Sequence, residues 1–184
     1  MQAIDKNYIY EMKTDNSSKR VISGYASVFD NKDAQGDIVL AGAFGKNITE
    51  KAADIKFLWQ HNPYKPIGII KTLREDNYGL YVEAELNESS RLANEATALI
   101  KQGALSGLSI GFKANKTRYN KKGEREILAL NLLEISIVTF PANPKAKIGF
   151  ITKSFSDPPN LEQRLVIAAK NINNLTEQLT KKIL

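Results

Sequence analysis

The 184-residue sequence predicts an α+β domain that is rich in strands and contains one well-defined central helix. In the first half, β-branched and aromatic runs alternate with polar turns, which is typical of strands. A segment with helical spacing lies between the serines at 89–90 and Gly103. The composition then changes at 154–160, SFSDPPN, which indicates a linker. The expected organisation is therefore a domain over 1–153, a linker over 154–160 and a C-terminal helix over 161–184.

The strands are predicted from apolar content and alternation. In chain order they are 8–12, 20–29, 55–60, 67–73, 80–86, 105–112 and 126–140. The fourth and fifth should form a hairpin, because they flank an Asp76–Gly79 turn and the fifth alternates apolar with polar residues. Pro63 and Pro66 are expected to prevent a regular ladder directly after 55–60, since proline has no amide hydrogen.

Helices are predicted in three places. A weak helical stretch covers 42–53. The central helix begins after Ser89 or Ser90, whose hydroxyl can accept a first-turn amide, and ends at Gly103. Beyond the linker, apolar residues recur every three or four positions and form a narrow stripe along one amphipathic helix. That helix can pack on the domain, pair with a second copy or dock a partner.

Composition excludes several classes of protein and site. No stretch is long and apolar enough for a transmembrane helix, and the N-terminus lacks the pattern of a secretory signal. The absence of cysteine removes disulfides, thiolate metal sites and a cysteine nucleophile. Because His61 is the sole histidine, a His-rich metal site is excluded as well. A site made of carboxylates alone is what remains for a metal. We expect neither a cofactor nor a metal.

The net charge of +6 is unevenly distributed. Residues 1–140 hold 19 basic and 17 acidic side chains, whereas 141–184 hold seven and three. A solvated basic tail explains this excess better than a nucleic-acid surface, which would place its charge on the folded body. A nucleic-acid role would rest on that tail and on five body residues, Lys113, Lys116, Arg118, Lys121 and Lys122. Binding to nucleic acid is therefore disfavoured.

The remaining nucleophiles are Ser, Thr and Lys. A serine hydroxyl needs a base within hydrogen-bond reach, and His61 is the one imidazole available for that role. A lone histidine at a strand end is more often structural. Trp59 and Pro63 crowd it with apolar mass, which should favour the neutral, basic form.

Two further segments can supply the other groups of such a site. Ser106 and Ser109 lie among three glycines at 103–112, which suits an oxyanion site but also an ordinary glycine-rich strand. Glu134 interrupts an apolar strand, where a buried carboxylate needs a donor. That donor can be an imidazole or a basic residue such as Arg125.

These segments together resemble the tailed-phage prohead (capsid maturation) protease family. The matching blocks, in the family's order, are ISGYASVFDNKDAQGDIVLAGAF at 22–44, LWQHNPYKPIG at 58–68, GALSGLSIGF at 103–112 and LLEISIVTFPANPKA at 132–146. The resemblance covers roughly residues 20–148. It implies a mostly antiparallel β-barrel with surrounding helices, similar to the herpesvirus assemblin proteases.

The resemblance also implies a serine endopeptidase without a cofactor. His61 would be the base, Ser109 the nucleophile with Ser106 as its rival, and Glu134 would take the place of the second histidine of assemblins. Family members act inside the prohead in the cytoplasm of the bacterial host. They cut the scaffold or the N-terminal region of the major capsid protein, and themselves, for which the 151–160 linker is an exposed candidate.

The main alternative is a non-catalytic assembly protein that binds scaffold or capsid protein. The predicted helix at 161–184 suits such a role, and it could also mediate self-association. A membrane partner is not expected, because no apolar span exists.

Overall fold

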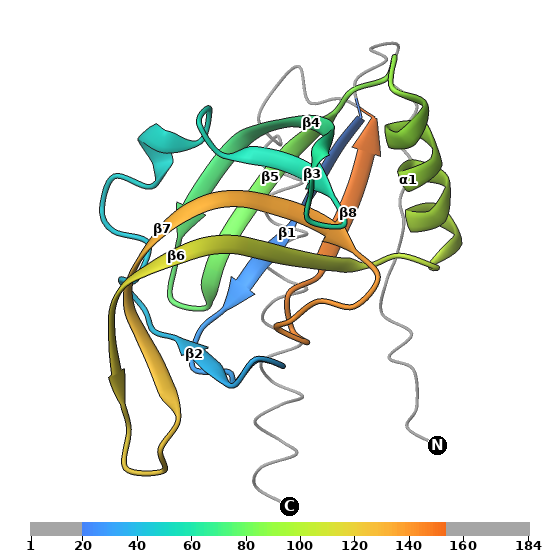
Figure 1. Ribbon diagram of the computed structural model, residues 1–184. Coiled ribbons are helices and arrows are strands. Elements are labelled where there is room, and N and C mark those ends of the chain that lie inside the picture. Colours follow the sequence, from blue (N-terminus) through green and yellow to red (C-terminus); the bar gives the residue numbers. More distant parts are fainter. Residues whose placement is uncertain (1–19, 154–184) are drawn as a thin grey trace, which may run out of the picture. The chain divides into compact units, whose positions relative to one another are not determined.

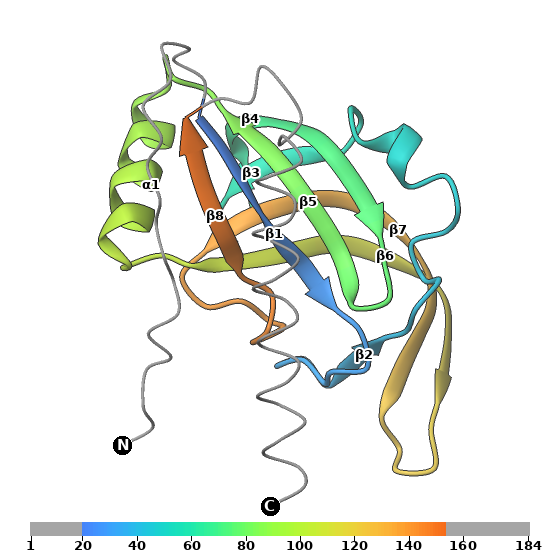
Figure 2. The same cartoon turned by 180° about the vertical axis from the view of Figure 1, so that it is seen from behind.

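A computed structural model describes residues 20–153 of the chain, which form one curved sheet flanked by one α-helix (Figures 1 and 2). The elements, in chain order, are β1 (Arg20–Val28), β2 (Asp37–Val39), the short 3-10 helix η1 (Thr49–Lys51), β3 (Lys56–Trp59), β4 (Asn62–Glu75), β5 (Gly79–Leu86), α1 (Arg91–Gln102), β6 (Gly107–Tyr119), β7 (Arg125–Val138) and β8 (Ile148–Lys153). The expected strand at 8–12, the linker at 154–160 and the helix at 161–184 lie outside the described residues.

The strands form one sheet with the order β2-β7-β3-β4-β5-β1-β8, and β6 pairs with β7 beside this path. The β2–β7 and β3–β7 pairs are parallel and the others are antiparallel. The sheet curls into a half-barrel, from which the β6–β7 hairpin projects (Figure 1). The expectation of a mostly antiparallel, strand-rich fold is confirmed.

The helix α1 has the ends that the sequence predicts. The Ser90 hydroxyl accepts from the amide of Ala93 at 3.4 Å, and Gly103 ends the helix with a φ of +80°. Within residues 20–153 α1 is the one α-helix, so the expectation of several surrounding helices is not met there. The expected helix at 42–53 forms turns and η1 instead.

The 58–75 region departs from the sequence prediction. Pro63 and Pro66 both lie within β4, although they were expected to interrupt pairing. The ladder tolerates them because its register shifts on either side of the Leu58–Pro66 pair, and both prolines are exposed. The turn before β4, at residues 60–61, contains His61 and determines where its side chain lies.

The two faces of the β6–β7–β3 layer have different roles. Phe57 and Ile135 pair across β3 and β7 and belong to the hydrophobic core. On the opposite face, Ser109 pairs with Ser136, and Ser136 pairs with Leu58. Side chains one position apart on a strand point to opposite faces. The face opposite this hydrophobic core therefore carries two small polar side chains, Ser109 and Ser136, and both of them are buried.

Candidate active site

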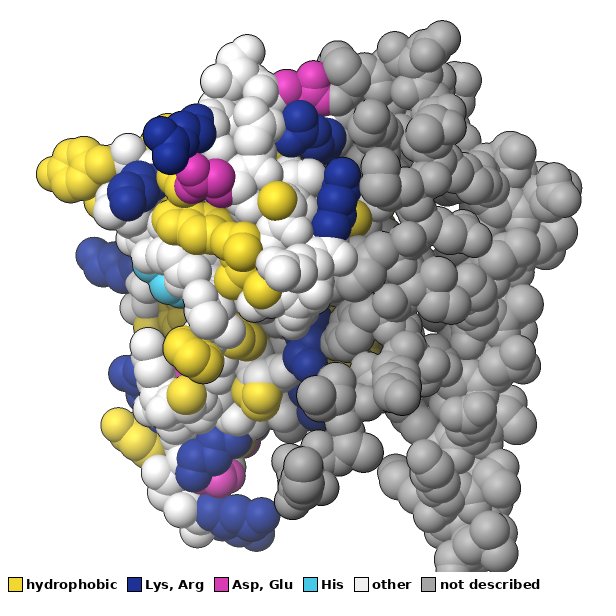
Figure 3. All heavy atoms as spheres, turned by 90° about the vertical axis from the view of Figure 1, so that its right-hand side faces the viewer, with side chains coloured by type: hydrophobic (Ala, Val, Ile, Leu, Met, Phe, Trp, Pro, Cys, Tyr) yellow, Lys and Arg dark blue, Asp and Glu magenta, His cyan; other side chains and the backbone are white. Residues whose placement is uncertain are grey.

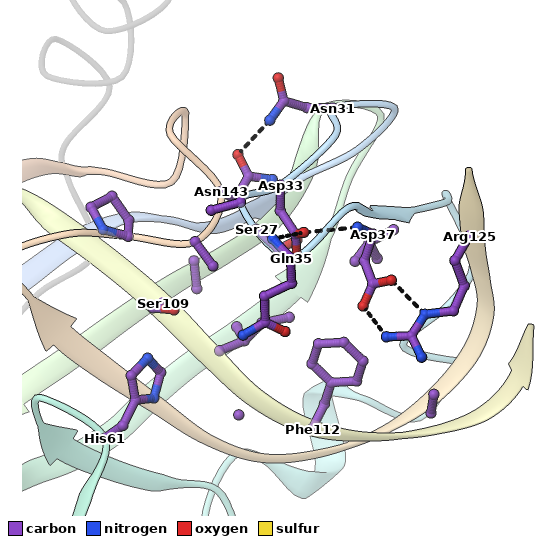
Figure 4. A pocket seen from close by; sticks show the side chains of 18 of the residues that line it. Ser27, Asn31, Asp33, Gln35, Asp37, His61, Ser109, Phe112, Arg125 and Asn143 are labelled. Atoms are coloured by element: carbon purple, nitrogen blue, oxygen red, sulfur yellow. Dashed lines mark hydrogen bonds and ion pairs between the residues drawn. The ribbon is translucent and has the colours of Figure 1, made fainter. Parts of the chain in front are cut away.

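Ser109 lies on β6 and is 4% exposed. It lines a cavity of about 810 Å³ together with His61, and Figure 4 shows both side chains at the same side of that cavity. Ser106 precedes β6, does not line the cavity, and its carbonyl accepts from the amide of Ile148 at 2.8 Å. The geometry therefore favours Ser109 over Ser106 as a partner for His61.

The turn that presents His61 is left-handed at two successive residues. Gln60 and His61 have φ values of +52° and +57°, which cost about 1–3 kcal/mol each for residues other than glycine. Strand β7 compensates by binding this turn. The Gln60 amide donates to the Ile137 carbonyl at 3.0 Å, and the His61 amide donates to Oγ of Ser136 at 3.1 Å. The Gln60 side chain also donates to Oγ1 of Thr139 at 2.8 Å. The histidine backbone is thus fixed although its ring is partly exposed.

Glu134 is the partner of His61. Its Oε1 lies 2.6 Å from Nδ1 of His61, and the Ser136 hydroxyl donates to its Oε2 at 2.5 Å. The Glu134 side chain is 13% exposed, whereas that of His61 is 44% exposed. Arg125, the alternative partner for Glu134, instead binds Asp37 through Nε and Nη2 at 2.5 Å each.

The Glu134 contact decides the protonation behaviour of His61. The hydrogen bond from Nδ1 to the carboxylate raises the pKa of His61 above its ordinary value, and the charge of Glu134 adds to the rise. Partial burial lowers the pKa of His61, which is the direction expected from crowding of the ring, but the contact with Glu134 outweighs it. A protonated Nδ1 facing Glu134 leaves Nε2 as the basic nitrogen in the neutral ring.

The cavity extends from His61 and Ser109 along β6 to the Asp37–Arg125 pair (Figure 4). Two loops form its other wall. In the first, the Asp33 carboxylate accepts from the amides of Gln35 and Asp37 at 2.8 Å each. In the second, Asn143 accepts from the Asn31 side chain at 3.1 Å. In Figure 3, the chain's one histidine is visible at the surface near hydrophobic side chains.

Sequence reasoning did not assign roles to several residues of this site. Asp37 follows a polar loop and begins β2, and no local pattern predicts that Arg125 pairs with it rather than with Glu134. Ser136 lies two positions after Glu134 in a strand, which places both side chains on one face, and this spacing is the local signal for their hydrogen bond. Asn143 lies in a loop and donates to the Val28 carbonyl at 2.8 Å, a contact between residues far apart in the chain.

Residues 20–153 contain no cluster of three or more acidic or histidine side chains that is placed to hold a metal ion. Over the same range, no helix combines the length and apolar character needed to cross a membrane.

Comparison with known proteins decides the family. The sequence profile of the caudovirus prohead serine protease family matches residues 7–159. The chain belongs to this family. The prohead protease of Enterobacteria phage HK97 is 36% identical over 141 residues, which are 74% of this chain and 62% of that protein. The prohead protease of Escherichia phage T5 is 34% identical over 125 residues, 66% of this chain and 58% of that protein.

This member of the prohead protease family is also similar to part of a longer protein. The capsid polyprotein of Pseudomonas phage PAJU2 is 34% identical over 170 residues, which are 88% of this chain and 24% of the polyprotein. The matched region spans about six tenths of the HK97 and T5 proteases.

Solved structures confirm the assemblin-like fold. The bacteriophage T4 capsid assembly protease has a TM-score of 0.52 at 12% identity, over 64% of this chain and 82% of its own. The KSHV protease in complex with a hexapeptide phosphonate inhibitor has a TM-score of 0.50 at 10% identity, over 82% and 75%. At such low identity the likeness concerns the fold.

Proposed function

We propose that this chain is the serine endopeptidase of phage capsid maturation. The observation that carries the proposal is the 2.6 Å contact between Nδ1 of His61 and Glu134, beside a cavity that Ser109 shares with the histidine. An imidazole oriented by a carboxylate and placed near a serine is the arrangement that activates a hydroxyl nucleophile. Membership of the prohead protease family supports the same assignment.

The chemistry proceeds by acyl transfer. Oγ of Ser109 attacks the carbonyl carbon of the scissile peptide, and Nε2 of His61 takes the hydroxyl proton as the new C–O bond forms. His61 then gives this proton to the leaving amine as the C–N bond breaks. A water molecule then gives a proton to the same nitrogen and attacks the acyl carbon. As the ester C–O bond breaks, His61 returns that proton to Oγ of Ser109. Glu134 keeps the Nδ1 proton in place and stabilises the imidazolium in both halves.

The cavity offers a binding mode for an extended peptide. The amide of Leu108 donates to the Ala146 carbonyl, away from β7, so the backbone groups of Ile110 point to that same edge of β6. Among the described residues, no strand pairs with this edge beyond Leu108. Residues 109–114 of β6 all line the cavity. A substrate strand added there would lie directly beside Ser109.

The proposed substrates are the scaffold or the N-terminal region of the major capsid protein, and the chain itself at 154–160. The first residues of the expected 151–160 linker are excluded, because residues 151–153 belong to β8 and Ile151 is buried. A capsid polyprotein that contains a region similar to this chain is consistent with capsid substrates. The proposed setting is the prohead interior within the cytoplasm of the bacterial host. We also propose that 161–184 is a docking helix tied by the 154–160 linker, and that it mediates any self-association.

The test is co-expression with the major capsid protein, followed by mass spectrometry of both chains over time. Ser109→Ala should abolish processing, a loss of several orders of magnitude, because the nucleophile is gone. Ser106→Ala is the matched control and should process normally. If Ser109→Ala processes its partner normally while Ser106→Ala does not, Ser106 is the nucleophile. If both variants process the partner at the normal rate, the endopeptidase assignment fails and the non-catalytic assembly role takes its place.

A deletion tests the division of labour within the chain. Removing 154–184 should leave hydrolysis of a peptide substrate intact, since His61, Ser109 and Glu134 all precede the linker. Incorporation into proheads should fall, which is measured by the amount of protease that co-sediments with them. A soluble, monodisperse 1–153 chain that cannot cut a peptide cleaved by the full chain would contradict this division.

A further inference from the structure

Two residues next to the carboxylate of Glu134 have no role in the proposed mechanism. One is Ser136, which lies two residues further along β7. The other is Gly111, which faces Glu134 across the β6–β7 ladder. We propose that Ser136 and Gly111 are positioning residues that fix the Glu134 carboxylate against Nδ1 of His61.

Ser136 joins the two members of the pair directly. Its hydroxyl donates to Oε2 of Glu134 at 2.5 Å, and the same oxygen accepts from the backbone amide of His61 at 3.1 Å. Ser136 is fully buried, so water does not compete for either bond. Because Oε2 is tied to Ser136, the other oxygen, Oε1, is held toward Nδ1 of His61. One buried hydroxyl thus sets both the rotation of the carboxylate and the position of the histidine backbone.

Gly111 contributes by having no side chain. A Cβ placed on it would collide with Oε1 of Glu134 and would lie 2.9 Å from Cδ and Cγ of that residue. The φ of Gly111 is not in the left-handed region, so its conformation does not require glycine. Glycine is required at this position for space, since the carboxylate that binds His61 occupies the place of a β-carbon.

A collision with a side-chain carboxylate differs from a collision with backbone. Glu134 can rotate away from an added methyl group, whereas a backbone carbonyl, such as that of Glu85 facing Gly68, cannot. Gly111→Ala should therefore leave the fold in place and move the Glu134 carboxylate. Ser136→Ala should release the same carboxylate by a different route, through loss of a hydrogen bond. The two substitutions are independent perturbations of one contact.

His61 offers a direct readout, because it is the chain's sole histidine and gives one set of imidazole signals in an NMR titration. Among the described side chains, Glu134 is the charged residue that perturbs the pKa of His61. Lys56 lies opposite Glu134 on β3, and its side chain is exposed to solvent. The titration uses the full chain with Ser109→Ala, which prevents self-cleavage. In that parent, the pKa of His61 should lie above about 6.5.

Ser136→Ala and Gly111→Ala should each lower the pKa of His61 toward about 6.5, because the carboxylate no longer faces the ring. Two matched controls should leave it unchanged. Thr97→Val removes a buried hydroxyl that donates to the Ala93 carbonyl in α1, and Gly149→Ala adds a methyl group with its nearest neighbour at 3.7 Å. A folded Ser136→Ala or Gly111→Ala chain in which the histidine titrates as in the parent would overturn the role of that residue. Ser136→Ala removes a single oxygen atom and serves alone if Gly111→Ala does not fold.

A kinetic arm rests on the proposed function, whereas the titration does not. With Ser109 restored, Ser136→Ala should lower kcat by about tenfold or more. This loss should be smaller than the loss of about 10² to 10⁴-fold that follows removal of a general base. KM should change little, since Ser136 does not line the cavity. A lowered pKa in a chain that cuts nothing even with Ser109 present would reject the proposed activity while retaining the positioning role. An unchanged kcat in an active Ser136→Ala enzyme would overturn the positioning role.

Discussion

Two carboxylate–cation pairs are linked to the same cavity, and they share much of their geometry. Glu134 binds His61, and Asp37 binds Arg125. In each pair the carboxylate side chain is largely buried, 13% and 2% exposed, and the cation is 44% exposed. Both carboxylates would be costly to bury without a partner. The pairs differ in the chemistry of the cation.

This difference assigns the two pairs different tasks. Arginine stays protonated at every physiological pH, so Asp37–Arg125 is a permanent brace between β2 and β7. Histidine changes its charge near neutrality, so Glu134–His61 can take up and release a proton during a reaction. The two pairs have similar burial and similar contact lengths. The Asp37–Arg125 pair is nevertheless a fixed link between strands, whereas the Glu134–His61 pair can support acid–base chemistry.

The most direct test of this difference replaces the histidine of the Glu134–His61 pair with arginine, the cation of the Asp37–Arg125 pair. His61→Arg can retain an ion pair with Glu134 but offers no neutral nitrogen to accept the Ser109 proton. Cleavage of a peptide substrate should fall by about 10² to 10⁴-fold or more, the contribution of a general base. Circular dichroism should show an intact fold. Peptide cleavage at the normal rate would mean that His61 is not the base.

Glu134→Gln removes the anion while keeping the size of the side chain. Activity at neutral pH should fall by about 10²-fold, less than for Ser109→Ala, because orienting residues usually matter less than the nucleophile. The acid limb of the pH–rate profile should also move to lower pH. The sign follows because the carboxylate raises the pKa of His61, so its removal lets the imidazole become neutral at lower pH. A limb that moves upward would contradict the assigned pairing.

Disruption of the Asp37–Arg125 pair should lower the stability of the fold more than it lowers the rate of peptide cleavage. Arg125→Met leaves the buried carboxylate of Asp37 unpaired and should lower the free energy of unfolding, by less than for a fully buried pair because the Arg125 side chain is 44% exposed. Urea denaturation in the Ser109→Ala background measures this loss. The double variant Asp37→Asn, Arg125→Met should recover part of it. Full additivity of the two single losses would show that the residues do not act as a pair.

The smallest expected effect is the pH dependence of stability. Folding raises the pKa of His61, so the stabilisation from Glu134 is fully present below about pH 6.5 and is lost as pH rises through the folded-state pKa. Its size should be below about 1 kcal/mol, since the ring is half exposed. Unfolding free energies of the Ser109→Ala chain, with and without Glu134→Gln, should converge as pH rises through this window. Because Arg125 remains charged, the effect of Arg125→Met should stay flat there.

Local patterns in the sequence determined the elements that need no distant partner. Alternation along 80–86 predicted β5 and its hairpin with β4, and Ser90 and Gly103 marked the two ends of α1. Composition left His61 as the one imidazole that can act as a base for a serine nucleophile. The short blocks around His61, Ser109 and Glu134 identified the family that the profile match confirms. The catalytic roles of these residues remain proposals.

The tertiary structure decided which partner each charged side chain takes. Glu134 had two candidate donors in the sequence, and the parallel pairing of β3 with β7 brings His61 to it from 73 residues away. The parallel pairing of β2 with β7 takes Arg125 to Asp37, 88 residues away. The left-handed turn at Gln60 and His61 is likewise stabilised by bonds to β7. No local periodicity encodes a contact between strands so distant in the chain, because such pairing is selected by the packing of the whole sheet.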